Sequence, residues 1–140
     1  MNWSEFKNIF NDCELQGEKI VIHSNLLKTI EFVKNNYRFE LLKEIIAVDN
    51  GDSTTELTYK LFSPEDSEEV LISINVQNEA ESISSIFESA IADEKEIFDL
   101  FGIRFNGNPE LKRLYMPEDW KGHPLKKDYI ENDERLKWNE

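Results

Sequence analysis

Cysteine is almost absent from this 140-residue chain. With Cys13 as the single thiol, an internal disulfide is impossible, and so is a zinc or iron–sulfur site built from this chain's thiolates alone. Catalysis by a lone thiol needs a neighbouring base, and the sequence identifies none. Because free cysteine is among the most buried residue types, we expect Cys13 to be a packed, neutral side chain.

Positive charge and long apolar runs are also scarce. The chain has 16 basic and 29 acidic residues, a net charge of −13, which excludes generic nucleic-acid binding and disfavours a charge-based lipid anchor. No apolar run approaches the roughly 20 residues that span a bilayer. The first residues lack the apolar core of a signal peptide. We therefore expect a cytoplasmic chain with no membrane span and no nucleic-acid partner.

Apolar periodicity, by contrast, is abundant. Alternation over 55–62 and 70–76 predicts strands, and 19–23 and 39–49 are further strand candidates. The hairpin signal Asn50-Gly51 stands between 39–49 and 55–62. Helical spacing predicts a short helix near the N-terminus and a helix capped by Ser24. A helical region over 82–101 restarts near Asp93, at capping-box spacing from Glu96, and ends at Gly102. These elements predict an α+β fold of two layers, with a mixed or antiparallel sheet and helices on one face.

The composition changes near residue 103. Residues 104–127 carry six basic and three acidic side chains and three of the four prolines, on a chain that is otherwise strongly acidic. Proline-rich chain with little alternation buries little against itself. We expect a single domain made of a compact α+β part, 1–103, and an extended partner-binding C-terminal segment, 104–140.

Three carboxylates on the last predicted helix are the first chemical candidates. Glu94, Glu96 and Asp99 could act as an acid–base pair or hold a metal. They could equally pair with the basic residues of 104–127 or face water, and surface acids are rarely catalytic, so we favour this second interpretation. A stand-alone hydrolase that uses Glu96, Asp99 and His123 would need a pocket joining the three.

His123 and Trp120 are the other candidates. His123 stands in Lys-Gly-His-Pro without a second histidine or cysteine at ligand spacing, which favours a structural histidine bonded to backbone in a tight turn over a base or ligand. Trp120, in a charge-mixed segment rich in proline and glycine, is either an interface anchor or packs on this chain's own sheet. On these residues the chain is a binding or assembly subunit rather than a self-sufficient enzyme.

Two sequence blocks carry a family resemblance. Residues 94–103 read EKEIFDLFGI, and residues 118–128 read EDWKGHPLKKD. In this order and spacing they resemble the 30-kDa subunit family of respiratory complex I, also called the C subunit of NADH:quinone oxidoreductase. The family includes the matching subunit of energy-converting nickel–iron hydrogenases. Three positions depart from its pattern. Lys95 and Lys126 stand for arginines, which loosens any bidentate clamp, and Asn108 stands for a histidine, which leaves a hydrogen-bonding role but excludes proton handling.

The resemblance implies a non-catalytic, cofactor-free structural and assembly subunit with no activity alone. It would sit in the peripheral arm of a proton-translocating NADH:quinone oxidoreductase, on the cytoplasmic face of the inner membrane. It would dock on the 49-kDa-type subunit, a relative of the hydrogenase large subunit, beside neighbouring iron–sulfur subunits. FMN, iron–sulfur clusters and quinone, or a NiFe centre, would belong to those partners. The alternative is the equivalent subunit of a membrane-bound energy-converting hydrogenase.

The same resemblance implies which residues form the interface or brace it. Glu94, Glu96 and Asp99 would pair with basic residues and so fix the helix against the C-terminal segment. The full set of interface or bracing residues is Glu94, Glu96, Asp99, Gly102, Pro109, Glu118, Asp119, Trp120, Gly122, His123, Pro124, Leu125, Lys126, Lys127 and Asp128. None is expected to be catalytic, to bind a cofactor or to hold a metal.

Overall fold

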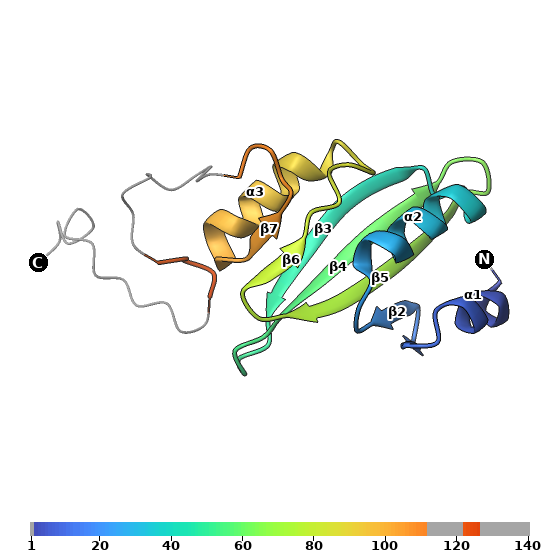
Figure 1. The fold of residues 1–140 in the computed structure, drawn as a ribbon, viewed down its shortest axis with the longest axis horizontal. Helices are drawn as coiled ribbons and strands as arrows, with labels where there is room; N and C mark the ends of the chain where they lie inside the picture. Colours follow the sequence, from blue (N-terminus) through green and yellow to red (C-terminus); the bar gives the residue numbers. More distant parts are fainter. Residues whose placement is uncertain (1, 112–121, 127–140) are drawn as a thin grey trace, which may run out of the picture.

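A computed structural model describes residues 2–111 and 122–126 of the chain (Figure 1). Its helices and strands alternate irregularly along the sequence. In order they are α1 (Trp3–Ile9), β1 (Cys13–Gln16), β2 (Lys19–Ile22), α2 (Leu26–Tyr37), β3 (Leu41–Asp49), β4 (Thr55–Ser63), β5 (Glu68–Val76), β6 (Glu79–Glu81), α3 (Ala90–Phe101) and β7 (Arg104–Asn106).

The main sheet has five strands in the order β1-β2-β5-β4-β3. The consecutive strands β3, β4 and β5 pair antiparallel, which confirms the predicted meander. Strand β2 pairs with β5 in parallel and with β1 antiparallel, so the sheet is mixed. This order leaves β3 at one edge of the sheet, next to α3 (Figure 1).

Helices α2 and α3 lie on the same face of the sheet, as the predicted two-layer fold requires (Figure 1). The alternation in β4 explains this, because Leu57, Tyr59 and Leu61 point to the helices and are fully buried. Ile72 on β5 and Ile30 on α2 are buried in the same apolar core. The α+β fold class is thus confirmed, with the core between one helical layer and one face of the sheet.

The hairpin signal Asn50-Gly51 is confirmed between β3 and β4. The loop spans 50–54, and the Asn50 N–H donates to the Thr54 carbonyl at 2.9 Å. Gly51 has a φ of +84°, a left-handed conformation that glycine adopts without steric cost. Loop and strands together hold β3 in register with β4 from Glu44 to Asp49, and an irregularity between Leu42 and Glu44 shifts the register before that point.

The cap predicted for α2 is wrong by one residue. The helix follows Asn25, which has a φ of +59° and makes no side-chain cap bond. The Ser24 hydroxyl instead donates to the Asp12 carboxylate at 3.3 Å. The tertiary contact with Asp12 has replaced the local cap that serine spacing indicates.

Cys13 is buried, as predicted. Its side chain is 4% exposed, and the thiol donates to the Phe10 carbonyl at 2.7 Å. Burial raises the pKa of the Cys13 thiol. A thiol held neutral in this way serves packing, because thiolate is the reactive form.

A second, two-stranded sheet frames α3. Strands β6 and β7 pair in parallel, with Ala80 opposite Phe105. Backbone bonds extend the pairing at both ends, from Ser82 N–H to the Asn106 carbonyl and from Arg104 N–H to the Asn78 carbonyl, each 2.9 Å. The predicted C-terminal segment therefore begins as a short strand directly after α3.

Candidate partner-docking site at the end of helix α3

Helix α3 ends at Gly102, as the sequence predicts. Gly102 has a φ of +77°, and its N–H donates to the Phe98 carbonyl at 2.9 Å. The His123 ring lies directly against this glycine, since a Cβ added there would come within 2.6 Å of the ring atom Cδ2. The two sequence blocks therefore meet at one point, where the absence of a side chain at 102 makes room for a side chain from 123.

One side-chain and one backbone hydrogen bond to helix carbonyls attach residues 122–126 to the last turn of α3. The His123 Nδ1 lies 2.9 Å from the Asp99 carbonyl, and the Leu125 N–H donates to the Leu100 carbonyl at 2.8 Å. These carbonyls belong to the last four of the helix, which have no partner inside it. A carbonyl only accepts, so Nδ1 carries the hydrogen. The predicted backbone bond of His123 is thereby confirmed.

A buried carboxylate fastens the other end of α3. Glu94 is fully buried, and its carboxylate accepts hydrogen bonds from the Ser82 hydroxyl (2.6 Å), the Ile83 N–H (2.9 Å) and the Asn108 amide (2.9 Å). We call these four residues the Glu94 clasp. The clasp joins α3 to the loop after β6 and to the turn after β7.

Burial dominates the electrostatics of the clasp. It raises the pKa of Glu94, and the three hydrogen bonds oppose that shift without reversing it. Asn108 also donates to the Ile91 carbonyl at 3.3 Å and accepts from the Glu110 N–H at 2.8 Å. The hydrogen-bonding role left open for Asn108 is therefore its actual role.

The expected pairing of the helix carboxylates with basic residues needs correction at Glu94. Glu94 bonds to neutral donors, because it points into the core beside the loop after β6. Glu96 is exposed and Asp99 is fully buried, so the expectation that these acids face water holds for Glu96 alone. Within the part of the chain that the structure describes, Lys95 makes an ion pair between α3 and the C-terminal segment, with its Nζ 3.9 Å from Glu110.

The predicted restart of the helix near Asp93 is also wrong. α3 begins at Ala90 after Ser89, and Asp93 lies inside its first turn. There Asp93 accepts a hydrogen bond from the Ile45 backbone on β3, which opposes the rise in its pKa that burial causes. Asp93 and Glu96 have the spacing of a capping box. In the structure, however, the Asp93 carboxylate bonds to a neighbouring strand instead of capping its own helix.

The remaining predicted site residues divide between two groups. Pro109, Gly122 and Leu125 are exposed, whereas Pro124 and Lys126 are half-buried. We call the place of the His123 ring, against Gly102 and the Asp99 carbonyl, the His123 seat. Five predicted residues lie outside the described residues: Glu118, Asp119, Trp120, Lys127 and Asp128. Sequence reasoning missed Ser82 and the Ile83 N–H as partners of Glu94, since serines in a polar loop give no distinguishing signal.

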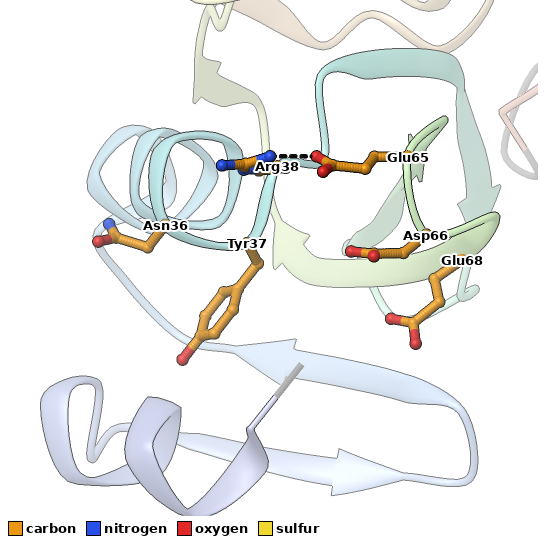
Figure 2. A pocket seen from close by; sticks show the side chains of 6 residues that line it. All are labelled: Asn36, Tyr37, Arg38, Glu65, Asp66 and Glu68. Atoms are coloured by element: carbon orange, nitrogen blue, oxygen red, sulfur yellow. Dashed lines mark hydrogen bonds and ion pairs between the residues drawn. The ribbon is translucent and has the colours of Figure 1, made fainter.

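Two hollows lie near charged side chains. One, of about 380 Å³, lies beside the end of α2 and the β4–β5 turn, where Arg38 and Glu65 form an ion pair (Figure 2). The other, of about 200 Å³, lies between β3 and α3 and is lined by Glu96 but by neither Asp99 nor His123. The three groups that a hydrolase would need are therefore not joined there.

Over residues 2–111 and 122–126, no group of three or more His, Cys, Asp or Glu side chains is placed to hold a metal ion. Among the helices that the structure describes, none is long and apolar enough to cross a membrane.

The polar groups of the site brace backbone, and its surface presents an exposed leucine, Leu125, beside Lys126. Comparison with known families makes the assignment specific. Residues 20–135 match the family model of the respiratory-chain NADH dehydrogenase 30 Kd subunit. The chain belongs to this family, whose members are subunits of a multi-subunit respiratory complex.

Curated relatives agree with the family model. The C subunit of the NADH-quinone oxidoreductase of Moorella thermoacetica is 32% identical over 134 residues, which cover 89% of this chain and 90% of that protein. The J subunit of the NAD(P)H-quinone oxidoreductase of Parasynechococcus marenigrum is 37% identical over 117 residues, 84% of this chain and 52% of that protein. The C/D subunit of the NADH-quinone oxidoreductase of Phocaeicola vulgatus is 32% identical over 123 residues, and the match spans only 22% of that longer protein.

Among solved structures, a chain of the archaeal membrane-bound sulfane sulfur reductase has the same fold. The TM-score is 0.69 at 18% identity, over 91% of this chain and 82% of that one. At this identity the likeness concerns the fold alone.

Proposed function

We propose that this chain is a non-catalytic, cofactor-free structural subunit of the peripheral arm of a proton-translocating NADH:quinone oxidoreductase. It docks on the 49-kDa-type subunit at the cytoplasmic face of the membrane. The observation that carries the proposal is the closure of residues 122–126 onto the end of α3. This closure leaves Leu125, 52% exposed, at the surface of the two sequence blocks that define the family resemblance.

The chemistry of the site supports a structural role. The Glu94 carboxylate accepts three hydrogen bonds, and the His123 Nδ1 donates one to the Asp99 carbonyl. These bonds hold separate segments of the chain together, as a structural role requires. An exposed apolar side chain on a braced segment is suited to burial against a partner.

The identity of the partner is supported by the fused relative. The C/D subunit of Phocaeicola vulgatus unites the C and D names in one polypeptide, of which this chain matches 22%. We identify the D portion with the 49-kDa-type subunit. Fusion of two subunits keeps them at high effective concentration, which is favourable for parts that are neighbours in the assembly.

The redox groups are assigned to the partners. FMN, iron–sulfur clusters and the quinone site would belong to neighbouring subunits. The alternative assembly, a membrane-bound energy-converting hydrogenase, would place a NiFe centre in the large subunit. The two assemblies are distinguished by the large subunit that this chain retains and by NADH–quinone or hydrogen turnover of the purified complex.

Leu125→Asp is expected to release the partner. A carboxylate at the centre of an apolar contact must be desolvated without a partner, which costs roughly 2–4 kcal/mol and lowers retention at least tenfold. The measurement is the amount of 49-kDa-type subunit that co-purifies with the tagged chain from gently solubilised membranes of its native host.

Leu15→Asp is the matched control for this substitution. Leu15 is 50% exposed on β1, at the opposite side of the sheet from β3. Both variants are expected to melt within a few degrees of the parent chain, since neither residue is in the core. Equal partner retention by the two variants would refute docking through Leu125. A parent chain that retains no large redox subunit would refute the proposed function itself.

A further inference from the structure

A groove runs between the edge strand β3 and helix α3. It encloses about 200 Å³. Six of the nine residues that line it are apolar and come from three segments: Ile45, Ala47, Ile97, Leu100, Phe101 and Leu125. Leu125 belongs to the segment seated on the end of α3, so the groove continues directly from the proposed docking site. Apolar walls of this kind favour an occupant with a long hydrocarbon stem.

Among the described residues, every charged side chain that lines the groove is acidic. They are Glu44, Asp93 and Glu96, from β3 and α3. Lys60 on β4 reaches Glu44 at 3.6 Å, but Glu96 is exposed and has no ion pair within 4.0 Å in the described residues. The groove is therefore complementary to a cation at the α3 side. A second copy of this chain, with a net charge of −13, is a poor match for that surface.

The edge of β3 adds main-chain groups to the groove. β3 is the last strand of the sheet, and the Ile45 N–H points outward, because it donates to Asp93 on α3. On an edge strand of an antiparallel pair, the N–H and carbonyl of every second residue point away from the neighbouring strand. The Ala47 N–H and carbonyl therefore point outward as well. On the far face of this edge, Ile46 and Val48 are 39% and 50% exposed. An exposed edge with apolar side chains invites an added segment.

We propose that an extended segment of the large partner subunit lies along the C-terminal half of β3 and places one arginine or lysine side chain in this groove. The inference rests on the proposed function and deepens it by naming the chemistry of the contact. The aliphatic stem packs on Ile97 and Leu125 while the cationic head meets Glu96. Arginine is the better occupant, because its guanidinium binds a carboxylate in a bidentate manner.

Glu96→Lys tests the charge complementarity in the assembled complex. The substitution places a cation against a cation, and we expect retention of the large subunit after a moderate salt wash to fall at least tenfold. Glu18→Lys is the matched control, since Glu18 is an exposed acid in the β1–β2 turn and makes the same charge change. Melting temperatures of the two purified variants establish that both are folded. Equal retention by the two variants would overturn the inference, while loss through Leu125→Asp would still support the proposed function.

A photo-crosslinking residue at position 48 identifies the occupant. The inference requires a crosslink to an extended segment of the large subunit that carries arginine or lysine. Exchange of that residue for glutamate is then expected to restore retention by the Glu96→Lys chain. A crosslink to a different subunit, to this chain itself or to lipid would overturn the inference, and so would a failure of the paired exchange to restore retention.

Discussion

Replacing Glu94 with alanine is expected to lower the free energy of unfolding by about 3 kcal/mol. The loss comes less from three hydrogen bonds than from the donors left behind, because the Ile83 N–H is buried and the Asn108 amide is directed at the vacated site. For a chain of this size the melting temperature should fall by about 10 °C. Urea unfolding followed by circular dichroism measures the free energy directly.

Glu96→Ala is the control for the clasp. It removes the same kind of side chain two residues along the same helix, but from an exposed position, and should change stability by less than about 0.5 kcal/mol. Equal effects at 94 and 96 would mean that the hydrogen bonds of Glu94 do not hold α3 to the loop after β6.

Glu94→Gln removes the charge of this side chain while keeping its size and shape. Burial raises the pKa of Glu94 above its ordinary value of 4.5, so the folded chain keeps this proton to higher pH than the unfolded chain. The contribution of Glu94 to stability is therefore greatest below 4.5 and declines as pH rises through the raised pKa. The parent chain should lose stability relative to the Gln variant as pH rises from 4.5 through the raised pKa of Glu94. A constant difference in urea midpoint over this range would contradict the shift.

Gly102→Ala is expected to have the second large effect, about 2–4 kcal/mol on unfolding and a loss of partner retention. Alanine is strained at a φ of +77°, and its Cβ would come within 2.6 Å of His123 Cδ2. The ring must leave its seat, which breaks the bond from Nδ1 to the Asp99 carbonyl. Thermal unfolding and the co-purification of the large subunit report the two consequences separately.

Gly17→Ala measures the cost of backbone strain alone, without the steric contact that Gly102→Ala adds. Gly17 has a φ of +63°, but a Cβ there would meet nothing within 4 Å. This variant should lose only about 1–2 kcal/mol and retain its partner. If both alanines have the same effect, the His123 seat contributes nothing beyond the conformation of Gly102.

Much of the fold could be predicted from local pattern. Strict alternation places Leu57, Tyr59 and Leu61 on one face of β4, and the structure confirms that face as the core. Gly102 ends α3 as predicted, since a glycine after an apolar helical run is a strong local stop signal. These features depend on residues within one turn or one strand, so a single sequence contains the information.

The helix starts and the partners of the carboxylates could not be predicted in the same way. Asp93 has the spacing of a capping residue but bonds to Ile45 on another element. Glu94 was expected to pair with basic residues, yet it bonds to Ser82, Ile83 and Asn108. A polar side chain takes whichever donor the fold brings near, and the spacing of residues along the chain does not specify that donor.

The sequence by itself determined the α+β class, the family and the two blocks that carry the resemblance, since these depend on the kind and order of residues. Only the tertiary structure decided that the blocks meet, with His123 seated on Gly102 at the end of α3. The physical reason is that a helix end leaves carbonyls without partners, and a segment more than 20 residues away supplies the donors. Which distant segment does so depends on packing in three dimensions, which periodicity and spacing do not encode.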